Sequence, residues 1–260
     1  MFVDSHLHLD SFENIDEVIN NAKERNVKYL IVSCCSMDEI ENGLKFINKY
    51  DNVFFSIGLH PSEANKYSKQ DLEKITQIIK QYRNKIIAVG EIGLDYYYGK
   101  DNVEKQRQLF DLQLQLAEHL NLPVVIHTRD ATADTIDILK SHSIKGVIHC
   151  FNGSIETANI YIKMGFKLGL GGVLTFKNTK LPCVIEKIDL SNIILETDSP
   201  YLAPVPLRGS INEPKNIPII AEKLAQIKEI SVFEVASITT NNVINLFDLK
   251  KWLWYIEINL

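Results

Sequence analysis

The sequence of 260 residues has few cysteines, no long hydrophobic run and no excess of basic charge. Its four cysteines, Cys34, Cys35, Cys150 and Cys183, follow neither the spacing of a zinc finger nor the density of a disulfide framework. No apolar stretch reaches the roughly 18 residues that cross a bilayer. The net charge of -5 excludes a general electrostatic attraction to nucleic acid, so an anionic substrate would have to be held by local charge.

These absences also bear on location. Cysteines without a disulfide pattern are typical of a reducing compartment. A candidate site that begins at residue 4 leaves no room for a signal peptide. We therefore expect a cytoplasmic protein that does not enter a membrane, and no feature of the pattern points to an obligate protein partner.

What the sequence does have is an alternation of short apolar runs with amphipathic segments. Eight runs are typical of strands: "FVDSHL", "YLIVSC", "VFFSIG", "IIAVGEIG", "PVVIH", "GVIHCF", "FKLGLGG" and "NIILETD". Helical periodicity marks the segments 14–25, 37–49, 71–82, 104–120, 131–141, 155–164, 180–188 and about 215–247. In 104–120, for example, leucines recur at helical spacing at Leu109, Leu112, Leu116 and Leu120.

The order of these segments predicts the fold class. Strands that alternate with helices indicate parallel βαβ units. Eight such units in about 250 residues fit an α/β fold of the (β/α)8 type, the TIM barrel. A doubly wound open sheet is the alternative, but no Gly-x-Gly-x-x-Gly follows the first strand. Because no linker, low-complexity tract or repeat interrupts the pattern, we expect one domain over 1–250, followed by an atypical C-terminal tail, 251–260.

The first strand-like run carries two histidines close to the start of the chain. In "MFVDSHLHLD", His6 and His8 are separated by one residue, and alternate side chains of a strand share one face. Neutral imidazole is a common metal ligand, so the pair could form half of a metal site. The alternative is a pair of surface or core histidines that bind no metal.

The barrel prediction places functional side chains at the C-terminal ends of the strands. Six residues of metal-ligand type lie at the ends of five predicted strands: His6, His8, Glu91, His127, His149 and Asp198. Imidazoles mixed with carboxylates suit zinc, manganese or related ions better than calcium. Six ligands exceed one four-coordinate site and indicate two ions bridged by a carboxylate. Such a centre holds a phosphate and lowers the pKa of water, which predicts metal-assisted hydrolysis.

Several longer motifs carry a resemblance to a known family. In order along the chain they are "DSHLHLD", "SIGLHP", "VGEIGLDYYY", "LNLPVVIHTRDA", "HCFNGS", "VLTFKN" and "ETDSPYLAPVPLRG…NEP". Over roughly residues 1–247 the sequence resembles the TatD family of metal-dependent deoxyribonucleases. The resemblance implies a TIM barrel with two divalent metal ions (Mg, Mn or Zn). It also implies hydrolysis of DNA phosphodiesters, commonly as a 3′-to-5′ exonuclease that prefers single strands.

The resemblance assigns roles to the predicted ligands. The ligands implied for one ion are His6, His8, Glu91 and Asp198, and those for the other are Glu91, His127 and His149. Glu91 would bridge the two ions, and Asp198 would also orient the attacking water as a base. Asp198 and Glu91 are therefore the predicted catalytic residues. Glu196, one layer deeper on the same strand face as Asp198, is expected to support the site rather than to bind metal.

Residues on the loops that face the site are predicted to bind substrate: His60, Tyr96, Arg129 and Arg208. His60 would contact substrate or water, or else support its own loop. Tyr96, within the tyrosine run 96–98, could stack on a base or pack the loop. The two arginines could contact phosphate.

One departure from the family pattern concerns DNA binding. The stretch "RGSINEP" has Ser210 and Ile211 where the family usually carries basic residues, which removes positive charge near the expected substrate entrance. Two other functions stay open: a hydrolase of the same barrel superfamily that acts on a small ester, amide or phosphoester, and a non-catalytic barrel that only binds a partner. Many such hydrolases have a carbamylated lysine where Glu91 stands, which favours the nuclease. The presence of all six ligands argues against a non-catalytic barrel.

Overall fold

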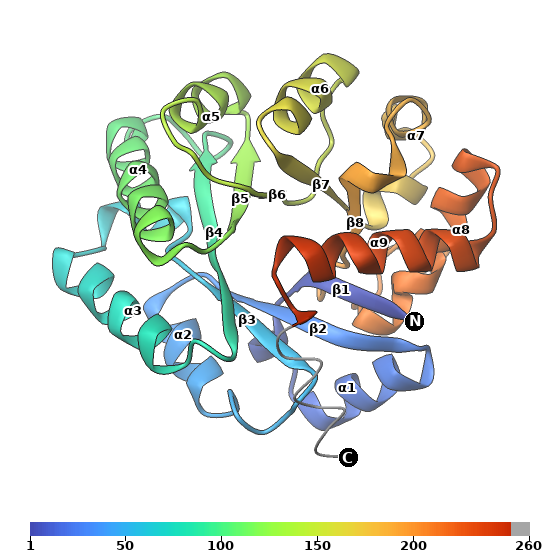
Figure 1. Cartoon of the computed structure of the whole chain (residues 1–260), viewed down its shortest axis with the longest axis horizontal. Helices are drawn as coiled ribbons and strands as arrows, with labels where there is room; N and C mark the ends of the chain where they lie inside the picture. The colour runs from blue at the N-terminus through green and yellow to red at the C-terminus, as the bar shows by residue number, and fades with distance from the viewer. Residues whose placement is uncertain (251–260) are drawn as a thin grey trace. The chain divides into compact units, whose positions relative to one another are not determined.

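The computed structural model describes residues 1–250, and the predicted tail, 251–260, lies outside the described residues. Strands alternate with helices along the chain (Figure 1). The strands are β1 (Phe2–Leu7), β2 (Val27–Cys34), β3 (Val53–Ile57), β4 (Ile86–Asp95), β5 (Val124–Arg129), β6 (Gly146–Ile148), β7 (Phe166–Leu170) and β8 (Ile193–Leu195). The α-helices are α1 (Ile15–Glu24), α2 (Met37–Leu44), α3 (Lys69–Gln81), α4 (Val103–Leu120), α5 (Thr132–Leu139), α6 (Ile155–Lys163), α7 (Leu181–Ile185), α8 (Ile217–Lys228) and α9 (Val232–Leu246).

The strand order of the sheet is β1 to β8 in chain order, and the described strand pairs are parallel. This is the topology of a (β/α)8 barrel, which confirms the predicted fold class. By its internal contacts the chain divides into two compact units. The first unit comprises Met1–Val32 and the residues from Cys150 on, and the second comprises Ser33–His149. The division of the chain into one domain and a tail stays a prediction.

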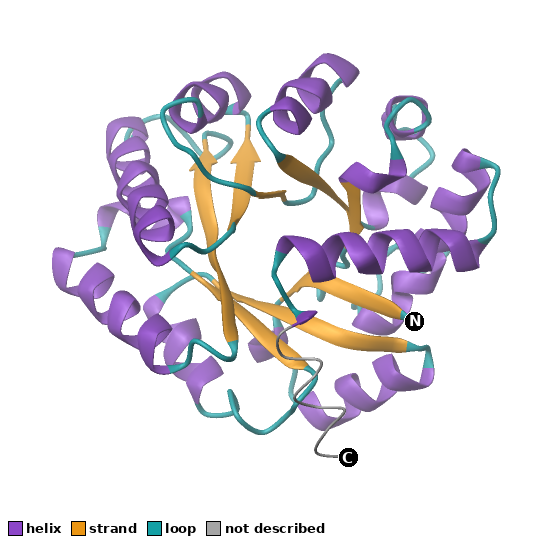
Figure 2. Ribbon diagram, viewed as in Figure 1, coloured by secondary structure: helices purple, strands orange, loops and turns teal. Residues whose placement is uncertain are grey.

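In the first unit, β1 pairs with β2 and β7 pairs with β8. A parallel bridge between Leu7 and Ser199 joins the end of β1 to the segment after β8. Helices α8 and α9 pack against both β1 and β8 (Figure 2). Helix α9 begins with a capping box, in which Ser231 and Glu234 each bond the other's backbone N–H. The helices thereby hold the two strands whose ends carry His6 and Asp198.

In the second unit, β4 pairs with β3 and β5 and is buried along its whole length. Helix α4 packs on β4 and on the 3-10 helix η2 (Pro61–Asn65). Its buried face contains Leu109 but also Gln106 and Gln113, whereas Leu112 is 38% exposed. The predicted leucine stripe is therefore wrong in part, because two glutamines of this face bind the backbone of Asp95, at the end of β4, and of Leu59, after β3.

Two further expectations from the sequence differ from the structure. Strands β6 and β8 end at Ile148 and Leu195, earlier than the predicted runs, so that His149 and Asp198 lie in the turns that follow. The helical region predicted over about 215–247 is divided into α8 and α9, because Glu229 adopts a left-handed backbone conformation with φ of 54°. Within residues 1–250, no helix is both long enough and apolar enough to cross a membrane.

Candidate metal centre

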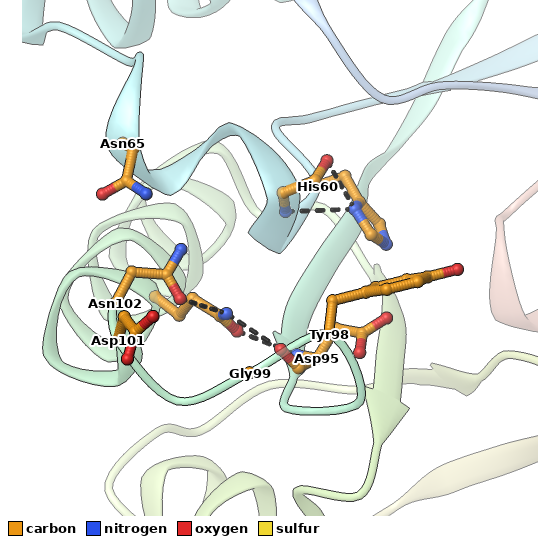
Figure 3. Close-up of a pocket in the computed structure, with 9 residues that line it drawn as sticks. His60, Asn65, Asp95, Tyr98, Gly99, Asp101 and Asn102 are labelled. Carbon is orange, nitrogen blue, oxygen red and sulfur yellow. Dashed lines mark hydrogen bonds between the residues drawn. The ribbon is translucent and has the colours of Figure 1, made fainter.

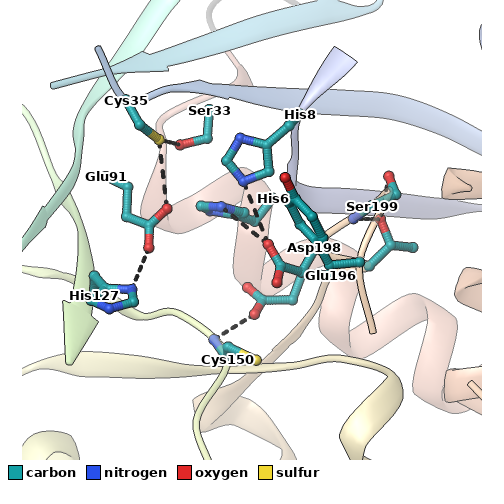
Figure 4. Close-up of polar contacts among 12 residues, drawn as sticks. His6, His8, Ser33, Cys35, Glu91, His127, Cys150, Glu196, Asp198 and Ser199 are labelled. Carbon is teal, nitrogen blue, oxygen red and sulfur yellow. Dashed lines mark hydrogen bonds and ion pairs between the residues drawn. The ribbon is translucent and has the colours of Figure 1, made fainter. Parts of the chain in front are cut away.

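In the first unit, the predicted metal ligands are His6, His8 and Asp198. The Asp198 N–H donates to the His6 carbonyl at 3.0 Å, and the His8 N–H donates to the Ser199 carbonyl at 2.8 Å. These backbone bonds set the Asp198 side chain beside both imidazoles (Figure 4). Its Oδ1 lies 3.8 Å from His6 Nε2 and 3.5 Å from His8 Nε2. Asp198 has φ of 57°, a left-handed conformation that short polar residues tolerate.

The buried carboxyl group of Asp4, on β1, stabilises this arrangement. Asp4, fully buried in β1, accepts hydrogen bonds from Thr197 Oγ1 at 2.5 Å and from the Thr197 N–H at 2.9 Å. It also accepts from the His6 N–H at 3.3 Å. Burial raises the pKa of Asp4 to about 8, against the effect of these hydrogen bonds. Asp4 thus ties the residue next to Asp198 to the strand that carries His6.

Glu196 lies deeper than Asp198 and is fully buried. Its Oε1 accepts a hydrogen bond from the Cys150 N–H at 2.5 Å. A Cβ atom at Gly169 would lie only 2.3 Å from Glu196 Oε2, so the strand β7 needs glycine where this carboxylate packs. The supporting role of Glu196 stays a prediction.

In the second unit, two of the predicted metal ligands, Glu91 and His127, contact each other. His127 Nδ1 lies 2.7 Å from Glu91 Oε1 (Figure 4), and His127 Nε2 lies 3.0 Å from Asp95 Oδ2. The imidazole is therefore held between two carboxylates of β4. Gly93 makes this approach possible: it has φ of 146°, and a Cβ there would lie 1.9 Å from the His127 carbonyl oxygen.

The two carboxylates control the charge of this imidazole. Burial lowers the pKa of His127, but the hydrogen bonds to Asp95 and Glu91 outweigh burial and raise that pKa to about 9. Burial raises the pKa of Asp95, but the hydrogen bonds with His127 and the Tyr97 N–H and the charge interactions with His127 and His60 together lower that pKa below its usual value. The two carboxylates therefore favour a positive charge at His127. A proton on the imidazole supplies such a charge, and a bound divalent cation would also supply it.

Asp95 is a residue of the candidate site that the sequence analysis did not identify. Gln106 of α4 holds its backbone at both ends: the Asp95 N–H donates to Gln106 Oε1 at 2.8 Å, and Gln106 Nε2 donates to the Asp95 carbonyl at 2.9 Å. The Asp95 side chain also accepts from the Tyr97 N–H at 2.9 Å. The signal available in the sequence was spacing, because Asp95 follows Glu91 by four residues and so shares its strand face.

His60 lies close to the same cluster. One ligand atom each of His60, Glu91 and His127 lie within 4.8 Å of one another, and the His60 ring meets the His127 ring edge-on at 4.5 Å. Gln113 of α4 fixes the residue before His60: the Leu59 N–H donates to its Oε1 at 2.7 Å, and its Nε2 donates to the Leu59 carbonyl at 2.9 Å. The structure thus brings His60 among the candidate metal ligands, whereas the sequence predicted only a substrate or supporting role for it.

A second residue that sequence reasoning missed is Cys35. Its thiol donates to Glu91 Oε2 at 3.6 Å, and the hydroxyl of Ser33 lies 3.3 Å from the sulfur (Figure 4). Burial raises the pKa of this thiol, so it stays protonated and able to donate. No spacing in the sequence links a cysteine after β2 to a glutamate of β4.

Four predicted site residues remain: His149, Tyr96, Arg129 and Arg208. His149 is buried directly after β6, and its N–H donates to the Ile126 carbonyl at 2.9 Å. The Tyr96 hydroxyl donates to Asp134 Oδ2 at 2.8 Å. The guanidinium of Arg129 lies 3.5 Å from the centre of the Tyr97 ring, and that of Arg208 lies 3.8 Å from the centre of the Phe176 ring.

The donor atoms fit a divalent metal. Ligands at 2.0–2.2 Å from one tetrahedral ion lie about 3.4 Å apart, and the contacts of Asp198 with His6 and His8 are close to that separation. Both contacts are longer than an ordinary hydrogen bond. In the second unit, a ligating imidazole whose other nitrogen faces a carboxylate is the usual arrangement in metal sites. His127, between Glu91 and Asp95, has that arrangement.

Comparison with known proteins agrees with this chemistry. The family described as TatD related DNase matches residues 3–248. The chain is 39% identical over 257 residues to the uncharacterized metal-dependent hydrolase YabD of Bacillus subtilis strain 168, covering 96% of this chain and 100% of the relative. It is 36% identical over 258 residues to the uncharacterized metal-dependent hydrolase YcfH of Escherichia coli K12, covering 95% of this chain and 96% of the relative.

A solved structure supports the fold assignment as well. The crystal structure of YjjV, a TatD homologue from Escherichia coli K12, is similar with a TM-score of 0.89 at 31% identity, covering 95% of this chain and 98% of that chain. The family match and the relatives each span almost the whole chain. The chain therefore belongs to the TatD family, and it is a metal-dependent hydrolase with a TIM-barrel fold.

Proposed function

We propose that this hydrolase cleaves DNA phosphodiesters with metal-activated water, and that it releases nucleotides from the 3′ end of single strands. The match to a family described as TatD related DNase supports the choice of DNA. The convergence of His6 and His8 on Asp198 is the structural observation that carries the metal chemistry. Polarity and strand preference are carried over from the resemblance of the sequence to the family.

We assign the ligands of two divalent ions as the resemblance implies. One ion takes His6, His8, Glu91 and Asp198, and the other takes Glu91, His127 and His149. Glu91 is the shared ligand. Mixed imidazole and carboxylate donors accept zinc, manganese or magnesium, so availability decides which metal is bound.

The residues of the chain then have distinct tasks. When bound, divalent ions supply Lewis acidity: they polarise a phosphoryl group and lower the pKa of water from 15.7 to about 7. Asp198, held beside both histidines by backbone hydrogen bonds, accepts the proton of the attacking water. Asp95 holds the proton on Nε2 of His127, which leaves Nδ1 as the donor atom toward a metal.

Substrate contacts are proposed for His60, Tyr96, Arg129 and Arg208. Arg129 and Arg208 each stack on an aromatic ring, which holds the guanidinium in place while its N–H groups can reach a phosphate. Ile211 is 71% exposed next to Ser210, where the family usually carries basic residues. We therefore expect DNA affinity to depend on the two arginines rather than on this stretch.

The cytoplasm is the proposed location. Within residues 1–250 the cysteines form no disulfide, which accords with a reducing compartment.

Single-stranded DNA labelled separately at each end tests the proposal. In Mg²⁺ or Mn²⁺ the protein should release mononucleotides from the 3′ end, and a chelator should stop the reaction. Glu91→Ala should lower the rate by about 100-fold or more, because it removes the shared ligand. The matched control is His119→Ala, at an exposed histidine of α4, which should cleave at the normal rate. If the folded protein leaves DNA intact in Mg²⁺, Mn²⁺ and Zn²⁺, the nuclease proposal is wrong, and small phosphoesters and amides become the next substrates to try.

A further inference from the structure

The second unit contains an open pocket between η2 and the loop that joins β4 to α4 (Figure 3). Its volume is about 400 Å³, within the range of roughly 300–1,000 Å³ that small-molecule pockets occupy. Figure 3 shows His60 and Tyr98 at one side and Asn65 and Asn102 at the other. None of the tasks assigned above uses Asn65, Asn102 or Tyr98.

The pocket adjoins the candidate metal cluster. Two of its lining residues, His60 and Asp95, also contact His127. The His60 ring meets the His127 ring at 4.5 Å, and Asp95 Oδ2 lies 3.0 Å from His127 Nε2. Only the side chain of His60 or Asp95 would therefore separate a group held in the pocket from His127, a proposed metal ligand.

The charge of the lining excludes a phosphate. Two carboxylates, Asp95 and Asp101, line the pocket, and no lysine or arginine is among the lining residues that the structure describes. Lys105 donates to Asn65 Oδ1 at 3.1 Å but does not line the pocket itself. The Arg129 guanidinium lies 3.5 Å from the centre of the Tyr97 ring and 5.4 Å from that of the Tyr98 ring, but Arg129 does not line the pocket either. An anion would meet net repulsion here, whereas an uncharged polar group would not.

The lining also offers a flat aromatic surface and amide groups. Tyr98 is 84% exposed, and Tyr97 supports it edge-on at a ring distance of 5.0 Å. Asn65 and Asn102 each carry an amide with both donor and acceptor atoms. A planar heterocycle with its own donors and acceptors matches this combination, since bases stack on exposed aromatic rings with little sequence preference.

We propose that this pocket holds one nucleobase of the DNA strand, stacked on Tyr98 and hydrogen-bonded by Asn65 and Asn102. The inference rests on the proposed function, and it names the part of the substrate that the second unit recognises. Its small volume suits a single base rather than a stack of several. The bound base would place its own phosphodiester toward His127 and the metal ligands.

Direct binding tests the pocket without any reaction. The whole chain, kept metal-free with a chelator, is titrated with thymidine while the side-chain amide signals of Asn65 and Asn102 are followed by NMR. Both signals should shift, and Tyr98→Ala should weaken binding about ten-fold, whereas Tyr98→Phe should bind as the unaltered protein does. The matched control is Phe233→Ala, at an 80% exposed ring on α9, which should not change binding. Absence of shifts, or equal shifts with the diamine putrescine, would overturn the proposal, the latter because the pocket would then prefer a cation.

A second comparison separates this inference from the proposed function. Oligonucleotides with a normal or an abasic 3′-terminal nucleotide are offered to the metal-loaded protein and to Tyr98→Ala. We expect removal of the base and removal of the ring each to slow cleavage about ten-fold, with no further loss when both are absent. Cleavage of DNA that is indifferent to both changes overturns the base pocket and leaves the nuclease intact. If no DNA is cleaved at all, the proposed function fails, and the thymidine titration still decides whether the pocket binds a base.

Discussion

At the scale of single residues, Asp95 is a carboxylate that positions a proposed metal ligand, His127. It contacts His127 through one carboxylate oxygen, and its backbone is fixed by Gln106. Carboxylate partners of metal-binding histidines commonly change affinity by about 10–100-fold when they are removed. We therefore expect Asp95→Asn to weaken metal binding by about that factor, as measured by competition with a chromophoric chelator.

A matched variant and a pH series separate positioning from loss of charge. Asp137→Asn removes the same charge from an exposed site on α5 and should leave metal affinity unchanged. In the metal-free protein, burial lowers the pKa of His127, but Asp95 and Glu91 raise it from 6.5 to about 9. The folded state thus binds this proton more tightly than the unfolded chain, so the resulting stability is complete below pH 6.5 and is lost as the pH rises through about 9. Asp95→Asn should flatten this loss, and equal metal affinity in the two variants would contradict the positioning role.

At the scale of elements, the buried face of α4 is what sequence periodicity could not predict. Leucine spacing predicts an apolar stripe that includes Leu112, yet Gln106 and Gln113 are buried instead. Hydrophobic periodicity treats glutamine as a surface residue, because it cannot register two hydrogen bonds to a distant backbone. The two glutamines lie two helical turns apart and hold the backbones of Asp95 and Leu59. Helix α4 is therefore a support for the candidate site as well as part of the core.

Removal of one of these two glutamine side chains should lower the stability of the folded protein. Gln113→Ala leaves the buried N–H and carbonyl of Leu59 without these partners, and it should lower the free energy of unfolding by about 1–3 kcal/mol. Gln115→Ala, on the exposed face of the same helix, removes a bond to Asp111 and should change it by less than about 0.5 kcal/mol. Urea denaturation monitored by circular dichroism measures both. If the two variants are equally stable, the hydrogen bonds of Gln113 to Leu59 do not stabilise the protein.

At the scale of the whole molecule, the sequence predicts the architecture well and the surroundings of the ligands poorly. Alternating runs are sufficient for eight strands because the strand period and the helix period differ. The C-terminal ends of those strands then indicate which histidines and carboxylates are candidates for one functional site. The spacing of Asp95 from Glu91 indicates a shared strand face, but the contact of Asp95 with His127 joins two strands, as does the contact of Cys35 with Glu91 across 56 positions of sequence. Such contacts have no local pattern in the chain.

We propose that this TatD-family chain cleaves DNA with metal held by its histidines and carboxylates. A single titration tests it most directly: metal-stripped protein receives Mn²⁺ in steps, and the rate of single-stranded DNA cleavage is measured at each ratio of metal to chain. We expect no cleavage without metal and a rate that rises until about two ions are bound per chain. Cleavage by the metal-free protein, or none at any ratio despite bound metal, would contradict the claim.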